Sequence, residues 1–164
     1  PIITFIDTPG AYPGMGAEER GQGEAIATNI MEMSRLKVPI ICIVIGEGSS
    51  GGALAIGVGD KIVMLENAVY SILSPEGFAS ILYKDSSKAK EAAENMKITA
   101  KDLKQFGIVN EIIKEPADGA QSDFQRITKD IKKYLVKNIK ELQELEIEEL
   151  LEKRSLKYAN LNIN

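Results

Sequence analysis

Apolar residues form short runs in the first two thirds of the chain and a periodic pattern near its end. Five of the runs are rich in β-branched residues and bounded by turn-forming residues, which is typical of buried strands. They occupy residues 2–6, 39–45, 61–65, 69–73 and 108–113. Apolar residues at spacings of three and four, together with helix-start residues, predict helices between them. These occupy residues 17–36, 53–56, 75–83, 87–96 and 99–105.

Strands and helices therefore alternate along this part of the chain. Such alternation predicts an α/β domain whose strands are largely parallel. In parallel sheets, ligands gather at the carboxyl ends of the strands. Two glycine-rich segments, residues 8–14 and 46–52, directly follow the first two strands. We therefore expect both segments at the ligand-binding edge of the sheet.

The composition changes beyond residue 116. From about residue 122 to residue 154, apolar residues recur at helical spacing among lysines and glutamates. This pattern predicts one long amphipathic helix, with a candidate break near Asn138. We expect residues 155–164 to fray. The sequence accordingly divides into a domain over residues 1–116 and a C-terminal helical extension over residues 117–164.

The composition describes an ordinary globular domain and excludes several function classes. The chain has 164 residues, of which 44% are hydrophobic and 27% charged, enough for one domain with a real core. Twenty Lys and Arg against 24 Asp and Glu give no basic surplus, so no nucleic-acid partner is expected. No apolar run approaches the ~20 residues that span a bilayer, so no membrane association is expected.

Cysteine and histidine usage narrows the chemistry further. The single cysteine, Cys42, lies inside an apolar run, which excludes a disulfide or structural zinc framework within the chain and favours a reducing, cytoplasmic location. The chain has no histidine. A Ser-His-Asp triad, a Cys-His dyad and a His-ligated metal contained in this chain are therefore excluded, and we expect no metal site in it.

The chain starts at Pro1, without a methionine, directly in an apolar run. A buried strand rarely opens a domain because its backbone groups need partners on both sides. We therefore interpret the chain as the later part of a longer protein.

The glycine-rich segments allow two nucleotide-binding interpretations. Residues 2–10 imitate the strand and Asp-x-x-Gly element of a GTPase, but no P-loop motif and no Asn-Lys-x-Asp guanine reader follow. Residues 46–51 match the Gly-x-Gly-x-x-Gly fingerprint of an NAD(P)-binding Rossmann-type domain, with Glu66 as the ribose ligand. Only about two turns of helix separate this fingerprint from Lys61, too few for an ordinary crossover between parallel strands.

An oxyanion hole is the third interpretation. Ser50-Gly51-Gly52 opens a short helix, so the first N–H groups have no partner within the helix, and the helix dipole adds partial positive charge there. Glycines at positions 51 and 52 leave a ligand oxygen free to approach. Such amides stabilise an enolate or tetrahedral oxyanion without any titrating side chain, which suits a chain without histidine.

Four segments in order resemble the carboxyltransferase α subunit of bacterial acetyl-CoA carboxylase, a member of the crotonase superfamily. They are residues 3–14, residues 16–21, residues 44–48 with 50–57, and residues 70–71 with 74–77. The resemblance runs over about residues 1–116 and corresponds to the later half of the family's chain. It implies an α/β, crotonase-like (ClpP/crotonase) spiral of ββα units, here followed by the long amphipathic helix.

The resemblance also implies an activity and its partners. Such enzymes move CO₂ from carboxybiotin, held on the biotin carboxyl carrier protein, to acetyl-CoA, and the product malonyl-CoA commits carbon to fatty acid synthesis. The implied assembly is an α₂β₂ carboxyltransferase that works with biotin carboxylase. Its β subunit carries zinc and most acyl-CoA contacts, while the α subunit faces the biotin. The alternative is an inert folded piece that needs its β partner.

Residue by residue, the resemblance places Gly51 and Gly52 on the catalytic glycines whose amides form the oxyanion hole for the biotin enolate. Further cofactor contacts are expected from Gly10, Tyr12, Gly48 and Ser50. Packing is the alternative role for Gly10 and Tyr12. Two segments depart from the family's pattern, namely Ser49, where the family usually has Gly, and residues 116–121.

Ser50 allows one more enzyme interpretation. A serine that opens a short helix before Gly-Gly resembles the nucleophile of Ser-Lys peptidases with this broader fold. In a chain without histidine, the base would have to be a lysine, such as Lys61 or Lys84.

Overall fold

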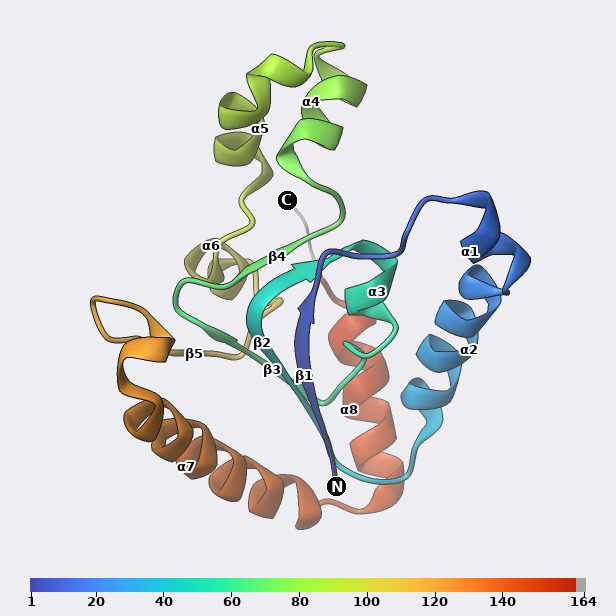
Figure 1. Cartoon of the computed structure of the whole chain (residues 1–164). Helices are drawn as coiled ribbons and strands as arrows, with labels where there is room; N and C mark the ends of the chain where they lie inside the picture. Colours follow the sequence, from blue (N-terminus) through green and yellow to red (C-terminus); the bar gives the residue numbers. More distant parts are fainter. Residues whose placement is uncertain (162–164) are drawn as a thin grey trace.

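The computed structural model describes residues 1–161 as a parallel sheet surrounded by helices (Figure 1). The strands are β1 (Ile2–Thr8), β2 (Ile40–Ser49), β3 (Lys61–Leu65), β4 (Val69–Ser71) and β5 (Glu111–Ile113). The helices are α1 (Met15–Glu19), α2 (Gln22–Arg35), α3 (Ser50–Leu54), α4 (Pro75–Leu82), α5 (Ala89–Met96), α6 (Ala100–Gln105), α7 (Phe124–Gln143) and α8 (Ile147–Ala159). Two 3-10 turns, η1 (Ser86–Lys88) and η2 (Ala120–Asp123), precede α5 and α7.

All strand pairs in the sheet are parallel, as the alternation of elements predicts. The sheet order is β1-β2-β3-β5, and β4 pairs with β2. The first part of β2 pairs with β3 from Ile41 to Val44, and its last part pairs with β4 from Glu47 to Ser49. The ten-residue strand β2 is therefore the centre of the sheet and carries the chain directly to the glycine-rich segment.

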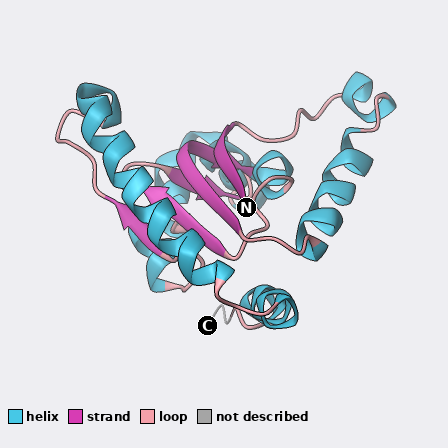
Figure 2. Cartoon of the chain, turned by 90° about the horizontal axis from the view of Figure 1, so that it is seen from below, coloured by secondary structure: helices cyan, strands magenta, loops and turns pink. Residues whose placement is uncertain are grey.

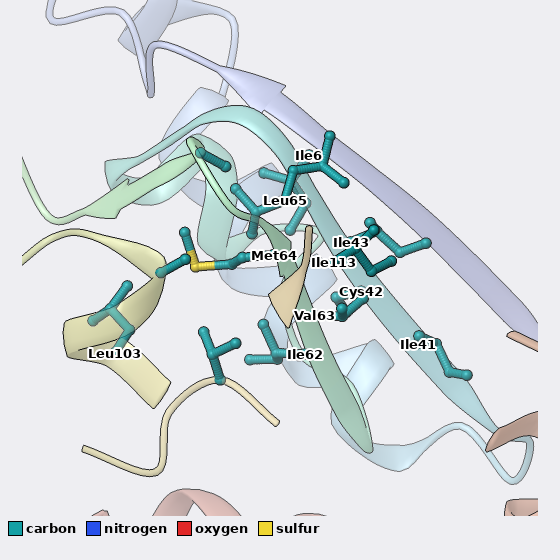
Figure 3. Packing of buried hydrophobic residues seen from close by; sticks show 14 of the residues in the cluster. Ile6, Ile41, Cys42, Ile43, Ile62, Val63, Met64, Leu65, Leu103 and Ile113 are labelled. Carbon is teal, nitrogen blue, oxygen red and sulfur yellow. The ribbon is translucent and has the colours of Figure 1, made fainter. Parts of the chain in front are cut away.

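The core lies on the two central strands. Residues 40–44 of β2 have no measurable exposure, and all of β3 after Lys61 is buried. Figure 3 shows these side chains meeting Ile6 of β1, Leu103 of α6 and Ile113 of β5. Strands that are covered on both faces need continuous apolar runs rather than alternation, and this is the pattern seen in the sequence.

Helices cover the sheet on either side (Figure 2). Helices α1 and α2 lie beside the edge strand β1, while α4 and α5 form a hairpin that stands away from the sheet (Figure 1). Helix α7 lies along the β5 side, and α8 returns across the molecule to contact α2. No helix of residues 1–161 is long and apolar enough to cross a membrane.

Two predicted helices are each divided in the structure. The helix expected over residues 17–36 is two helices, because Gly21 adopts a left-handed backbone (φ 74°) as the N-cap of α2. The long C-terminal helix breaks after Gln143 rather than near Asn138. Asn138 stays inside α7 because its side-chain amide donates to the carbonyl oxygen of Tyr134 (2.8 Å), which satisfies it within the helix.

Two segments are more ordered than predicted. The expected loop at residues 46–49 is strand, because these residues pair with β4 and extend β2. The expected frayed end, residues 155–164, is helical as far as Ala159, since the Tyr158 hydroxyl accepts a hydrogen bond from the Gly59 amide (2.8 Å). Residues 162–164 of that segment lie outside the described residues.

Candidate active site

The carboxyl ends of β1 and β2 bring the two glycine-rich segments together. β1 and β2 pair in register up to Ile6 and Val44, after which the register shifts so that Thr8 lies opposite Gly48. Beyond this point, the loop after β1 runs against the start of α3. The predicted meeting of the two segments at one edge of the sheet is therefore present.

Helix α3 begins at a backbone turn that a serine adopts with strain. Ser49 ends β2 in an extended conformation, and Ser50 then has a left-handed φ of 52°. Left-handed geometry costs a non-glycine residue roughly 1–2 kcal/mol, and such strain is found at functional sites. The turn sends the chain from strand to helix within one residue, so the first amides of α3 are presented at the edge of the sheet.

The amides of Gly51 and Gly52 point out of the start of α3. The Gly51 carbonyl accepts from the Ala55 amide (2.9 Å), which fixes the helical direction of the peptide groups. Within the described residues, neither the Gly51 nor the Gly52 amide donates a hydrogen bond to the protein. These two N–H groups are free to bind an acceptor, and the helix dipole favours a negatively charged one.

Packing, more than ligand access, requires glycine at position 52. A Cβ atom on Gly52 would lie 3.0 Å from the carbonyl carbon of Gly10 and 3.2 Å from the Thr8 hydroxyl oxygen. A Cβ on Gly51 would lie 3.2 Å from the end of the Ile26 side chain. The expectation that these glycines clear space for a ligand is therefore incomplete, because the loop after β1 fills that space at Gly52.

The other residues expected to contact the cofactor do not all lie near the amide pair. Gly10 (φ 111°) packs on Ser50, where a Cβ would come within 3.0 Å of the serine Cβ. Gly48 is buried in β2, and a Cβ there would lie 2.9 Å from the Tyr70 ring. Tyr12 is 73% exposed, with its ring against Gly14. The structure thus joins Gly10 and Ser50 to the amide pair, while Gly48 faces the interior of the sheet and Tyr12 projects outward.

An apolar cavity of about 420 Å³ adjoins Ser50 and Leu54 of α3. That volume is in the range of small-ligand pockets. Its walls include Leu54, Tyr70 and Phe78, and Lys97 adds a cationic side chain. Burial raises the pKa of Tyr70 to about 12, so its phenol stays neutral at ordinary pH. Sequence patterns alone did not indicate this cavity, although Tyr70 and Phe78 lie in or beside a segment of the family resemblance.

The dinucleotide interpretation does not fit this geometry. Gly46 and Gly48 lie inside β2 rather than in a turn, and a Cβ on Gly46 would lie 2.5 Å from an oxygen of Asp7. The Glu66 carboxylate is engaged by the Lys114 ammonium (2.5 Å) and the Glu115 amide (3.2 Å). These two ligands hold the pKa of Glu66 below its ordinary value. Gly46, Gly48 and Glu66 therefore serve the sheet and its connections.

The Ser-Lys interpretation also lacks its geometry. Lys61 begins β3 and lines a different cavity from Ser50, and Lys84 lies in the turn between α4 and α5. No group of three or more Cys, Asp or Glu side chains within residues 1–161 is arranged to hold a metal ion.

Solved structures with the same arrangement define the class of fold. The transcarboxylase 12S structure with methylmalonyl-coenzyme A and methylmalonic acid bound superimposes with a TM-score of 0.62 at 22% identity, over 82% of this chain and 27% of that one. The Pseudomonas malonate decarboxylase hetero-tetramer in complex with coenzyme A gives 0.71 at 16% identity, over 93% and 60%. The fold is therefore that of the crotonase-like carboxyltransferases.

Sequence comparison then gives the family. The chain belongs to the acetyl co-enzyme A carboxylase carboxyltransferase-like family, whose profile matches residues 1–162. It is 60% identical over 161 residues to the acetyl-coenzyme A carboxylase carboxyl transferase subunit alpha of Clostridium botulinum (strain Eklund 17B / Type B), covering 98% of this chain and 59% of the relative. The subunit alpha of Oceanobacillus iheyensis is also 60% identical over 161 residues, covering 98% and 51%. The chain thus spans between half and three fifths of the length of these relatives.

Proposed function

We propose that this chain is the α-subunit part of an acetyl-CoA carboxylase carboxyltransferase, which moves CO₂ from carboxybiotin on a carrier protein to acetyl-CoA and gives malonyl-CoA. The names of its relatives support the reaction class. The observation that carries the proposal is the pair of amides at Gly51 and Gly52, which have no partner in the described part of the chain and lie at the start of a helix, in a sequence without histidine. Such a pair can stabilise developing negative charge and needs no titrating group.

The residues around the amide pair fit a cyclic urea. Biotin joins an apolar sulfur-containing ring to a ureido ring whose carbonyl oxygen can accept hydrogen bonds. The Gly51 and Gly52 N–H groups could donate to that oxygen, and an apolar cavity lies beside the neighbouring Ser50. When bound, carboxybiotin supplies the carboxyl group, and its ureido oxygen gains negative charge as that group leaves. The Gly51 and Gly52 amides would donate to this oxygen, while Gly10 holds the turn of Ser50 in place.

In this proposal the chain stabilises negative charge, and the cofactor and the substrate supply the acid–base groups. We expect a zinc-containing β subunit to complete the site, in an α₂β₂ assembly that works with the biotin carboxyl carrier protein and biotin carboxylase. Gly48 and Tyr12 act on the cofactor only indirectly in this proposal, since one lies beneath Tyr70 and the other projects from the site.

Gly51→Pro tests the amide directly. Proline removes the N–H, and the Cβ that it adds at this position has the flexible end of Ile26 as its nearest neighbour, at 3.2 Å. The assay is carboxyl transfer from malonyl-CoA to biocytin, with and without the β subunit. We expect activity only with both subunits, and a fall in kcat of about 10²–10³-fold in the variant.

Gly51→Ala is the matched control, because alanine adds a Cβ at the same position and keeps the N–H. It should retain most of the activity. Size-exclusion chromatography must show both variants bound to the β subunit. A correctly assembled Gly51→Pro enzyme with unchanged turnover would contradict the role of the amide. Gly52 is less suitable for this test because any side chain there meets the Gly10 backbone.

A further inference from the structure

A second cavity lies at the opposite end of the sheet from Gly51 and Gly52. It has a volume of about 380 Å³ and is located where β3 begins and where α7 turns into α8 (Figure 1). Leucines of α7 and α8 form its apolar wall, while lysines of β3 and α8 form much of its polar wall. Neither the proposed carboxyl transfer nor the oxyanion hole uses this cavity.

Lys157 is the central group of this cavity. Its ammonium donates to the Asn110 side-chain oxygen (3.0 Å) and to the Asp60 carbonyl oxygen (3.4 Å), which are both neutral acceptors. The pKa of Lys157 is lowered to about 8, mainly by burial, and the nearby charge of Lys61 contributes to this lowering. A largely buried cation normally has an ionic partner, because burying an unpaired charge is costly.

The nearest carboxylate does not provide that partner. Both oxygens of Asp60 bind the Arg154 guanidinium, at 2.8 and 2.9 Å, and one of them also accepts from the Ile40 amide (2.7 Å). Lys61, which also lines the cavity, has no ion pair among the described residues. Two lysines without carboxylate partners therefore face the same space.

Asn110 adds a neutral donor to this pair. Its side-chain oxygen accepts from the Ile62 amide (2.8 Å) and from Lys157, which fixes the orientation of the group. The amide nitrogen then has no acceptor among the described residues, and Asn110 lines the cavity. Two cations and an oriented amide donor are the groups that bind a tetrahedral oxyanion.

The remaining charged groups determine the net charge of the cavity wall. Lys153 is engaged by Glu149 (2.6 Å) on the surface of α8, and Arg154 is neutralised by Asp60. Glu141 of α7 is the one carboxylate of the cavity wall that Arg154 does not bind, and it lies 3.8 Å from Lys137. The wall therefore has a positive excess, and Glu141 is the group that opposes an anion.

We propose that this cavity binds a phosphate-type oxyanion through Lys61, Lys157 and the side-chain amide of Asn110. The chemistry recognises the phosphoryl group, whether it is free or belongs to a nucleotide. Because the cavity lies at the amino ends of the strands, the bound anion would link β3 to α8 and stabilise the fold without entering the active site.

The first experiment is calorimetric titration of the purified protein with inorganic phosphate and, in a separate arm, with AMP. Lys157→Met keeps the length of the side chain and removes its charge, and it should weaken binding of either ligand at least tenfold. Glu141→Gln should strengthen binding several-fold. Lys90→Met, on the remote hairpin helix α5, makes the same charge change and should leave the affinity unchanged. Equal affinities would identify the free phosphoryl group as the ligand, and tighter AMP binding would identify a nucleotide.

A second experiment measures the apparent pKa of the Lys157 ammonium by NMR, with and without phosphate. Phosphate should raise its apparent pKa, and the affinity should fall between about pH 7 and about pH 9.5 as the ammonium loses its proton. The absence of measurable binding in the native protein would overturn the proposal. Equal loss of affinity in Lys157→Met and Lys90→Met would also overturn it, because it would show non-specific attraction. If Lys157→Met fails to fold, Lys61→Met makes the same comparison.

Discussion

At the scale of single residues, the candidate active site depends on backbone geometry rather than on side-chain chemistry. Ser50 adopts a left-handed turn, and Gly10 packs against it. Among residues 1–161, the amides of Gly51 and Gly52 have no protein partner. Two glycines in contact leave no room for a side chain at position 52. Substitutions here are therefore expected to act by moving or deleting an N–H group, as the Gly51→Pro experiment tests.

Lys157 should make the stability of the protein depend on pH. Its pKa is about 8 in the folded chain against an ordinary value of 10.5, with burial as the main cause, Lys61 adding to it, and Cys42 and Asp60 opposing it. Between these two values the unfolded chain binds more protons at this position, so the free energy of unfolding should rise with pH.

Urea titrations at about pH 8 and about pH 10 in phosphate-free buffer would measure this rise. Lys157→Met should lack the part of the rise that Lys157 contributes, while other groups titrate equally in both proteins. A rise of the same size in the variant would show that Lys157 does not cause it.

At the scale of elements, one buried side chain fastens α8 to the sheet. Arg154 is 2% exposed and donates to Asp60 as well as to three carbonyl oxygens, those of Met33, Leu36 and Val38. The carbonyl oxygens belong to the end of α2 and the turn into β2. The guanidinium therefore joins three segments that are distant in sequence, and it satisfies groups that would otherwise lie buried without donors.

Arg154→Met should lower the free energy of unfolding by about 3–5 kcal/mol, since it leaves the Asp60 carboxylate buried without its cation. Urea denaturation gives the measurement. Lys153→Met is the control on the same helix, because the exposed pair of Lys153 and Glu149 should contribute no more than about 0.5 kcal/mol. Similar losses in the two variants would show that the buried pair has no special role.

At the scale of the whole molecule, helices α7 and α8 contribute side chains to the hydrophobic core. Ile127 and Leu142 of α7 and Leu150 of α8 are at most 7% exposed and belong to the same hydrophobic cluster as β2 and β3. The composition divides the sequence into residues 1–116 and 117–164. We propose that the two segments nevertheless fold as one cooperative unit.

A chain that ends at residue 116 should therefore fail to fold cooperatively. It would lose three buried side chains, each worth about 2–5 kcal/mol, from a domain whose total stability is about 5–15 kcal/mol. Thermal unfolding followed by circular dichroism, with binding of a hydrophobic dye, would detect the loss. A sharp transition near that of the intact chain would contradict the proposed single unit.

Local composition was enough to predict most of the strands and helices and to exclude part of the chemistry. Runs such as residues 40–44 and 61–65 are apolar throughout because both faces of a central parallel strand are covered, so local composition alone indicates buried strands. The order of elements indicates the α/β class, and the absence of histidine excludes mechanisms that would need a histidine of this chain. Each of these properties is local or compositional, and neither kind depends on contacts between distant residues.

Contacts between residues that are distant in sequence are seen only in the tertiary structure. Gly10 packs on Gly52, Arg154 binds Asp60, and Lys157 shares a cavity with Lys61. Residues 46–49 are also strand only in the folded chain, because β4 pairs with Glu47–Ser49 and β1 pairs with Gly48. Glycine has no strand propensity strong enough to predict this pairing. In the sequence, a single arginine or lysine of an amphipathic helix cannot be distinguished from a solvent-exposed charge. Contacts across 40 to 94 positions of sequence depend on how the elements pack, which no short pattern records.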